Sequence, residues 1–324
     1  MSPRSSGVTV LSVRGSGSGT DGTGEEILAV RRFWERLGLP GLVDVHTHFM
    51  PERVLRKVWD YFDGLGPLTG GLEWPITYRS DEDQRLATIR EFGVRAFTAM
   101  LYPHKAGMAR WLNSWAVDFA RRTPDCLHTA TLFPEPGVEA YVLEAVEQGA
   151  RVFKAHVQVG AYDPADELLD PVWGLLAEAG VPVVMHCGSG PAPGKHTGPG
   201  PVAQVLARHP RLRLVVAHLG MPEYEDFLDL AERYGEVRLD TTMAFTDFSE
   251  RLAPFPRGPA PGSPASATAF CWVRTSPTSP IGTSTSCTPW SGSGSVTTGS
   301  ARSATGTERD SSGSRSRRNS HEPS

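Results

Sequence analysis

The chain has 324 residues, which is enough for one large barrel domain or two domains of average size. Its formal net charge of −4 argues against a nucleic-acid-binding surface, no window reaches the length of a membrane span, and the N-terminus lacks the regions of a signal peptide. The four cysteines show no paired metal spacing, so we expect reduced thiols in a cytoplasmic protein.

Composition divides the chain into three segments. Residues 1–24 are rich in glycine, serine and threonine and predict a disordered leader. Residues 25–256 have the composition of a globular domain. Residues 257–324 are mostly serine, threonine, glycine, proline and arginine, and the last leucine of the chain is Leu252. This third segment cannot bury a core and predicts a disordered tail.

In the middle segment, short apolar runs alternate with helical patterns. The strands are expected at Leu42–Val45, Arg95–Leu101, Leu127–Phe133, Arg151–His156, Val181–His186, Leu212–His218 and Val237–Asp240. The helices are expected at Arg53–Phe62, Asp81–Phe92, Ala106–Arg121, Val138–Gln148, Glu167–Ala179, Pro201–Arg208 and Tyr224–Tyr234. Several of these helices end in glycine, as at Gly93, Gly149 and Gly180, which suits a C-terminal cap.

Near-continuous apolar strands that alternate with helices predict a parallel sheet covered on both faces. Seven strands at similar spacing indicate an α/β fold, a (β/α)8 TIM barrel with its eighth strand missing. A doubly wound sheet is the alternative, but no glycine-rich dinucleotide fingerprint follows the first strand.

Four histidines stand where predicted strands end. His46 and His48 follow the first strand, and residues two apart in a strand face the same way, so both imidazoles can reach one divalent ion. His186 and His218 end two later strands in the same manner. Because barrel active sites form at the carboxyl ends of the strands, the four together predict a metal site.

With these motifs in place, the chain resembles the amidohydrolase superfamily, in its amidohydrolase-related branch of zinc-dependent hydrolases and of decarboxylases similar to aminocarboxymuconate-semialdehyde decarboxylase. The motifs that carry the resemblance are Gly41-Leu-Val-Asp-Val-His-Thr-His48, Val184-Met-His186 and Val216-Ala-His-Leu-Gly220. The resemblance extends from about Val30 to Pro256.

The resemblance implies an enzyme with one divalent metal ion, for which zinc is expected. It implies that His46, His48 and His186 bind the ion and that His218 is a further ligand or a catalytic acid–base. Lys154 and His156, two apart on the fourth predicted strand, and His104 after the second strand are expected to contact substrate. In two-metal relatives a lysine on the fourth strand is carbamylated and bridges both ions; for Lys154 we favour a substrate-binding or structural cation.

One part of the family pattern is missing. The resemblance implies a Gly-Ser-Asp after the eighth strand, whose aspartate binds the metal and takes a proton from water, and the chain contains no such motif. If the codons of the tail are read two bases along, the residues from about Thr268 permit Val-Leu-Leu-Gly-Ser-Asp-Phe-Pro. We therefore interpret the tail as a frameshift that begins near residues 256–266. The alternative is a natural low-complexity tail with an arginine-rich end.

The expected activity is hydrolysis of a small carbonyl substrate, such as an amide, a lactone or a related carboxylic acid, through a metal-activated water. A non-oxidative decarboxylase on the same scaffold and a catalytically defective barrel are the alternatives. The expected partners are a small-molecule substrate and a second copy in a homodimer, with neither nucleic acid nor membrane.

Overall fold

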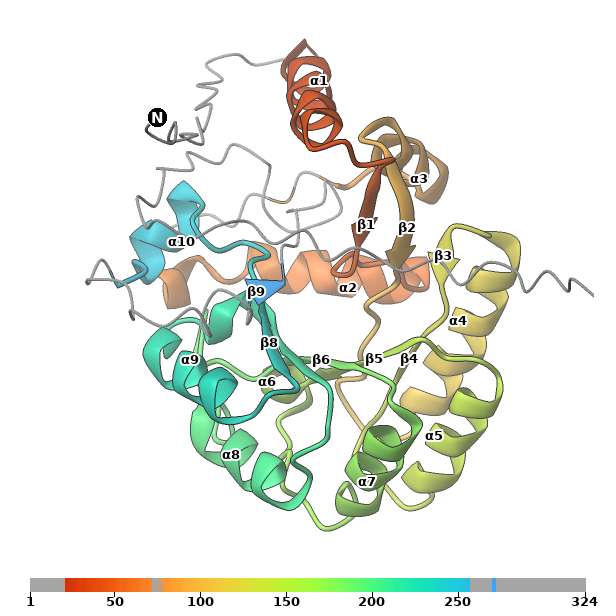
Figure 1. Ribbon diagram of the computed structural model, residues 1–324, viewed down its shortest axis with the longest axis vertical. Coiled ribbons are helices and arrows are strands. Elements are labelled where there is room, and N and C mark those ends of the chain that lie inside the picture. Colours follow the sequence, from red (N-terminus) through yellow and green to blue (C-terminus); the bar gives the residue numbers. More distant parts are fainter. Residues whose placement is uncertain (1–20, 72–75, 77, 257–269, 272–324) are drawn as a thin grey trace, which may run out of the picture. The chain divides into compact units, whose positions relative to one another are not determined.

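The computed structural model describes residues 21–71, 76, 78–256 and 270–271 (Figure 1). In chain order the elements are α1 (Asp21–Arg36), β1 (Leu42–Asp44), α2 (Glu52–Asp63), η1 (Gly66–Thr69), α3 (Glu82–Glu91), β2 (Val94–Thr98), α4 (Ala109–Arg122), β3 (Cys126–Leu127), β4 (Thr129–Thr131), α5 (Val138–Glu147), β5 (Val152–His156), α6 (Val157–Gly160), α7 (Asp170–Ala179), β6 (Val183–His186), α8 (Pro199–Arg208), β7 (Leu214–Val216), η2 (Ala217–Gly220), α9 (Tyr224–Arg233), β8 (Val237–Asp240), α10 (Asp247–Leu252) and β9 (Phe270–Cys271).

All strands are parallel and pair in chain order. One sheet has the order β1-β2-β3 and the other has the order β4-β5-β6-β7-β8-β9, and a single residue, His128, separates β3 from β4. A doubly wound sheet would reverse its strand order at a switch point, and these sheets do not. The predicted (β/α) barrel is therefore confirmed, with β3 and β4 as two halves of its third strand.

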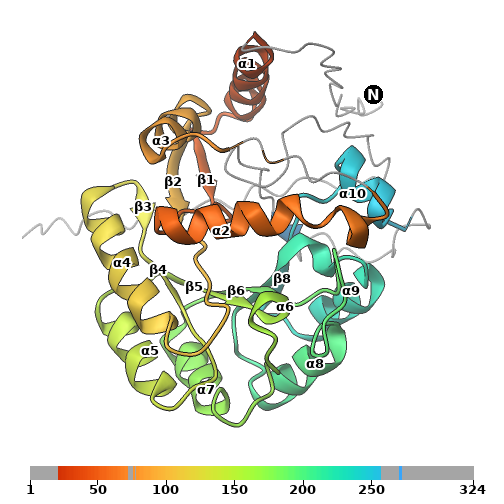
Figure 2. The same ribbon diagram turned by 180° about the vertical axis from the view of Figure 1, so that it is seen from behind.

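The helices cover the outer side of the strands. Figures 1 and 2 show α4, α5, α7, α8 and α9 arranged around β4 to β8. The largest apolar cluster lies between these two layers and includes the fully buried side chains of Phe153, Trp173 and Phe227. Along the described part of the chain, none of the helices has both the length and the apolar character that a bilayer span needs.

The first helix was not predicted. It begins at Asp21, inside the segment that composition assigned to a disordered leader, and Ile27 and Val30 pack on the core beside β1 and β2. Trp34 fixes its far end, because its indole Nε1 donates to the carbonyl of Phe92 at 3.1 Å. Gly93 has a φ of +86°, and a Cβ there would lie 2.5 Å from the Trp34 ring. Glycine at position 93, directly after α3, therefore permits both the turn that ends α3 and the docking of α1.

Only two residues of the predicted tail are described, and they occupy the place of an eighth strand. Phe270 and Cys271 pair in parallel with Leu239 and Asp240 of β8. The sequence predicted that the eighth strand is lost, and the structure shows two residues in its place. Among the described residues no ladder joins β9 to β1. The rest of residues 257–324, and residues 1–20, lie outside the described part.

Candidate metal centre

The two histidines after β1 are each held by a hydrogen bond through Nδ1. His48 Nδ1 lies 2.7 Å from the carbonyl oxygen of Met100, and a carbonyl only accepts, so this nitrogen carries the proton. His46 Nδ1 lies 2.7 Å from Oδ2 of Asp240. In both rings Nε2 is left as the lone-pair nitrogen that a metal ion binds.

His218 occupies a backbone conformation that is unfavourable for its residue type. It follows β7 with a φ of +57°, and Leu219 has a φ of +56°. Two contacts hold this turn: the His218 backbone N–H donates to Asp240 Oδ1 at 2.9 Å, and its Nδ1 donates to the carbonyl of Thr242 at 2.8 Å. Left-handed backbone at a non-glycine residue costs about 1–3 kcal/mol and persists where the surroundings fix it. Here it turns Nε2 of His218 toward His46, whose ring centroid is 5.0 Å away.

His186 ends β6 as predicted, but it uses its other nitrogen. Its Nε2 lies 3.0 Å from the carbonyl oxygen of Gly190, so Nδ1 is the nitrogen left for a ligand. The ring stacks on His156 with centroids 4.2 Å apart and meets the His218 ring at 5.0 Å. The structure therefore brings all four predicted ligands into one cluster.

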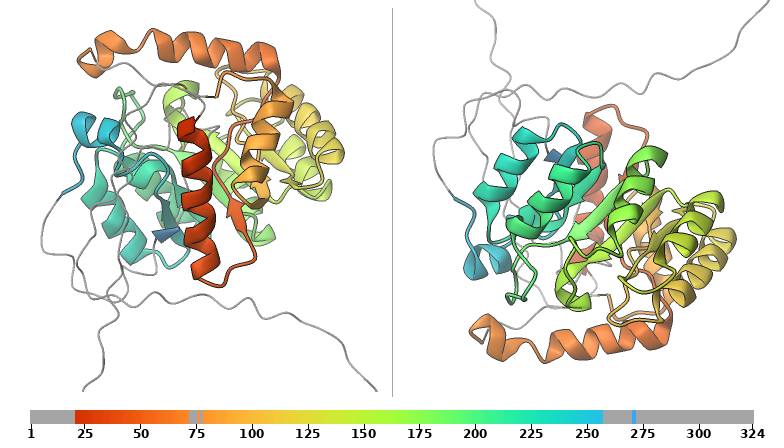
Figure 3. Two further views of the ribbon diagram at one scale, coloured as in Figure 1. Left: turned by 90° about the horizontal axis from the view of Figure 1, so that it is seen from above. Right: turned by 90° about the horizontal axis from the view of Figure 1, so that it is seen from below.

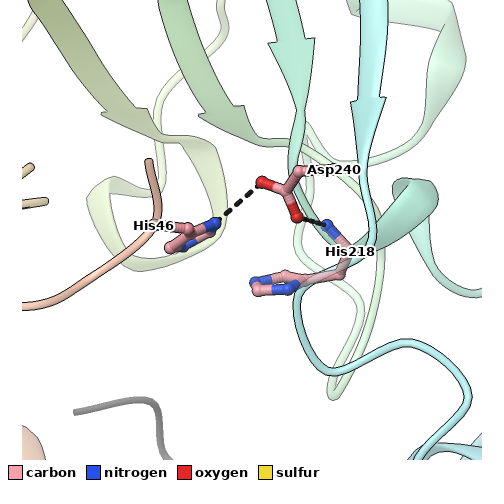
Figure 4. Close-up of side chains that lie close together, drawn as sticks. All are labelled: His46, His218 and Asp240. Carbon is pink, nitrogen blue, oxygen red and sulfur yellow. Dashed lines mark hydrogen bonds and ion pairs between the residues drawn. The ribbon is translucent and has the colours of Figure 1, made fainter. Parts of the chain in front are cut away.

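Asp240 is the last residue of the predicted strand Val237–Asp240. It is completely buried at the end of β8, and its carboxylate bridges His46 and the backbone of His218 (Figure 4). One ligand atom from each of His46, His218 and Asp240 lies within 4.8 Å of the others, and neither His48 nor His186 belongs to this group. An aspartate that ends an apolar strand was the available signal, but only the fold shows that β8 brings it to the first histidine.

The electrostatics of the cluster suit a cation. Burial lowers the pKa of all four histidines: that of His218 falls to about 4, and those of His48 and His186 fall well below their usual value. Burial alone would raise the pKa of Asp240, but the adjacent His46 and hydrogen bonds to the carboxylate hold it below its usual value. Neutral imidazoles beside one carboxylate are a donor set that fits Zn²⁺ and other divalent ions.

Lys154 lies inside the same cluster. Its side chain on β5 is 1% exposed, and Nζ has no hydrogen-bond partner among the described residues. Burial lowers the pKa of this amine to about 8, against a smaller opposing effect of Asp240. A buried ammonium without a partner is costly, which indicates that an anionic group belongs beside it.

A cavity opens over the cluster and contains two of the three predicted substrate contacts. Lys154 and His156 line it, whereas His104 is exposed and lies elsewhere. Three tyrosines, Tyr61, Tyr78 and Tyr102, form one part of its wall.

The fold and the site together define a (β/α)-barrel protein with a candidate metal centre at the carboxyl ends of its strands. The family model for amidohydrolases matches residues 43–273, well over half of the chain, and the chain belongs to this family. By family it is a metal-dependent enzyme.

Solved structures share the fold at low sequence identity. An uncharacterised TIM-barrel protein from Bordetella bronchiseptica has a TM-score of 0.57 and 18% identity, over 74% of this chain and 88% of that chain. The 5-carboxyvanillate decarboxylase LigW from Sphingomonas paucimobilis has a TM-score of 0.50 and 14% identity, over 76% of this chain and 91% of that chain. No curated protein sequence matches the chain.

Proposed function

We propose that this site serves a metal-dependent hydrolase of small carbonyl compounds, with His46, His48, His186 and His218 as the metal ligands. The observation that carries the proposal is the cluster of neutral histidines from three separate strand ends, with Asp240 hydrogen-bonded to the first of them. A divalent ion held there, with zinc expected, supplies Lewis acidity that makes water a nucleophile at neutral pH and polarises a carbonyl.

The chain's own residues divide the remaining work. Lys154, buried and unpaired in the described structure, binds a carboxylate or another anionic group of the substrate, and His156 borders the same space. The tyrosine wall favours a flat or aromatic substrate body. A pKa of about 4 makes His218 a weak base at neutral pH, which favours the role of ligand over that of proton acceptor.

Slow turnover is part of the proposal. Both oxygens of Asp240 already accept hydrogen bonds, and its pKa is held below the usual range, so this carboxylate is a weak base toward water. The test is to load the full chain with Zn²⁺ or Mn²⁺, then to assay lactones and amides of aromatic carboxylic acids. Weak, chelator-sensitive hydrolysis that is lost in His48→Ala supports the proposal. Metal-independent turnover, or turnover as fast as that of complete family members, contradicts it.

Decarboxylation is the second candidate, because LigW, with the same fold, is a decarboxylase. The partnerless Lys154 fits a carboxylate in either reaction. Release of CO₂ from an aromatic carboxylic acid, measured in the same metal-loaded preparation, separates the two: CO₂ without hydrolysis of any ester or amide assigns the lyase reaction.

We also propose that the tail arose by a frameshift. Two observations support this: the family match continues to residue 273, and Phe270 and Cys271 stand beside β8, where the shifted reading places two leucines of an eighth strand. Sequencing the DNA across codons 256–276 tests it. A frame that reads Gly-Ser-Asp after one insertion or deletion supports the frameshift, and the absence of such a frame establishes the tail as genuine.

We also propose that the protein is cytoplasmic. Cys126 and Cys187 are buried thiols outside any disulfide, as expected in a reducing compartment. Localisation of a tagged full-length chain checks this expectation.

A further inference from the structure

Exposed apolar side chains gather in one stretch of the chain. Of the nine large hydrophobic residues that are exposed in the described structure, five lie between residues 28 and 43. We call these five the α1 patch: Leu28, Phe33, Leu37, Leu39 and Val43. Val43 is 57% exposed although it belongs to β1, a barrel strand whose outer face a helix would ordinarily cover. α1 runs beside β1, so the exposed residues belong to adjoining elements (Figure 3).

Two charged residues of α1 stand symmetrically about its exposed apolar pair. Leu28 and Phe33 stand at equal distances along the sequence from the midpoint between Val30 and Arg31, and so do Glu25 and Arg36. All four are exposed. Neither Glu25 nor Arg36 forms an ion pair with another described residue, whereas Arg31 pairs with Glu35 within the helix.

This symmetry fits a second copy of the same helix. If two α1 helices pack antiparallel about that midpoint, Glu25 of each copy faces Arg36 of the other. The contact is made twice, with the leucine and phenylalanine side chains between the two ion pairs. A two-fold interface requires such self-complementarity, because each surface patch meets its own copy.

The sequence that follows β9 offers no equivalent cover. Residues 272–324 contain no leucine, methionine or phenylalanine, so they lack the side chains of an amphipathic covering helix. A copy of α1, in contrast, presents matching apolar and charged groups. We propose that the α1 patch is a self-association surface through which two copies of this chain form a dimer by antiparallel packing of α1. This proposal is independent of the activity of the metal centre.

The oligomeric state of the full chain tests the proposal by sedimentation velocity at about 1 to 100 µM, where mass action makes association visible. The wild type is expected to dimerise in this range, and Phe33→Glu is expected to be monomeric. Leu143→Glu is the matched control, because Leu143 on α5 is similarly exposed, at 44%, but lies outside the patch. It should dimerise like the wild type.

Charge reversal tests the antiparallel geometry. Glu25→Arg and Arg36→Glu each create two like-charge contacts and should weaken dimerisation roughly 3- to 30-fold. The double variant restores both opposite-charge contacts and should return within about threefold of the wild type. Because these residues are exposed, circular dichroism should show unchanged helix content.

Three results would overturn the proposal. One is a full-length wild type that stays monomeric to 100 µM. The proposal also fails if this chain dimerises only after removal of residues 272–324, because the tail itself would then cover the patch. Another is a Leu143→Glu variant as monomeric as Phe33→Glu. The third is a double charge variant that is no better than the single variants, which would exclude the antiparallel pairing.

Discussion

Asp240 sets which nitrogen of His46 faces the cavity. Its Oδ2 accepts from Nδ1 of His46 while Oδ1 accepts from the backbone N–H groups of His218 and Thr242. The carboxylate thus positions two candidate ligands at once: one through a ring proton and one through the strained turn after β7. A carboxylate behind a ligating histidine fixes the tautomer and raises the basicity of the ligand nitrogen.

The first prediction concerns this contact. In Asp240→Asn the amide can place an N–H against His46, which favours the tautomer whose Nε2 carries the proton and cannot bind metal. We expect metal affinity to fall about 10- to 100-fold, measured by titration calorimetry with Zn²⁺. Asp170→Asn is the control, because Asp170 pairs with His209 3.0 Å away on the surface. Equal loss in both variants would show a general effect on folding instead.

The second prediction is the pH dependence of metal binding. Protons compete with a metal for an imidazole only below its pKa, and burial lowers the pKa of His218 to about 4 and those of the other three ligands as well. Zn²⁺ affinity should therefore change little between about pH 7 and pH 5.5, whereas ligands with the ordinary histidine pKa of about 6.5 would lose affinity steadily over that range. A steady loss across this range would contradict the burial of the site.

The third prediction concerns Lys154 in the metal-free protein. Its folded pKa of about 8 lies below the usual 10.5, so the unfolded state binds more protons between these values, and the free energy of unfolding rises with pH across this window. Below pH 8 the cost of the buried charge is fully present. Lys154→Met should remove the rise and stabilise the metal-free chain by about 3 kcal/mol at pH 7, as measured by urea unfolding. A destabilised variant would reveal a partner for the ammonium.

Among the elements, the packing of α1 on the barrel depends on the space that a glycine leaves for the Trp34 ring. Gly93 and Gly149 share a φ of +86°, but a Cβ at Gly93 would meet the Trp34 ring of α1, whereas a Cβ at Gly149 would meet nothing within 4 Å. Both residues end helices, so they form a matched pair that separates backbone strain from steric overlap.

The fourth prediction uses this pair. Gly149→Ala should cost about 1 kcal/mol of unfolding free energy from backbone strain alone. Gly93→Ala should cost roughly 1–3 kcal/mol more, because the new methyl group displaces Trp34 and loosens α1. Urea unfolding and the fluorescence of the tryptophans in the native state measure both effects. Equal costs for the two substitutions would mean that α1 docks without this contact.

In the described part of the molecule no ladder joins β9 to β1, and this is the principal defect of the described barrel. Val43 is exposed on the outer face of β1, and β9 contributes only two residues to the ladder with β8. Unpaired edges and uncovered apolar faces reduce stability and favour association.

The fifth prediction follows from this defect. A gene whose frame is restored upstream of codon 268 should encode a longer eighth strand and the Gly-Ser-Asp motif. We expect that protein to unfold at a temperature at least several degrees higher than this chain, and to gain metal-dependent activity. Differential scanning calorimetry compares the two proteins. An unchanged melting temperature would show that the barrel is already complete without the restored segment.

The strands, most helices and the histidines at the strand ends could be predicted from the amino-acid sequence. Parallel barrel strands are short apolar runs, and the residues that follow each run can be read directly from the sequence. His46, His48, His186 and His218 were identified in this way, and the structure gathers them into one cluster. Helix α1 was missed because the glycine and threonine that precede its apolar face resemble a flexible leader.

The contacts among these residues could be seen only in the folded structure. Asp240 lies 194 residues from His46 in sequence, and only the sequential pairing of β4 to β8 and the curvature of the barrel bring its carboxylate to that imidazole. The nitrogen that each ring presents, the left-handed turn at His218 and the missing partner of Lys154 likewise depend on contacts between distant segments. Local patterns specify elements, whereas protonation and ligand geometry follow from burial and from neighbours that the chain meets only when it is folded.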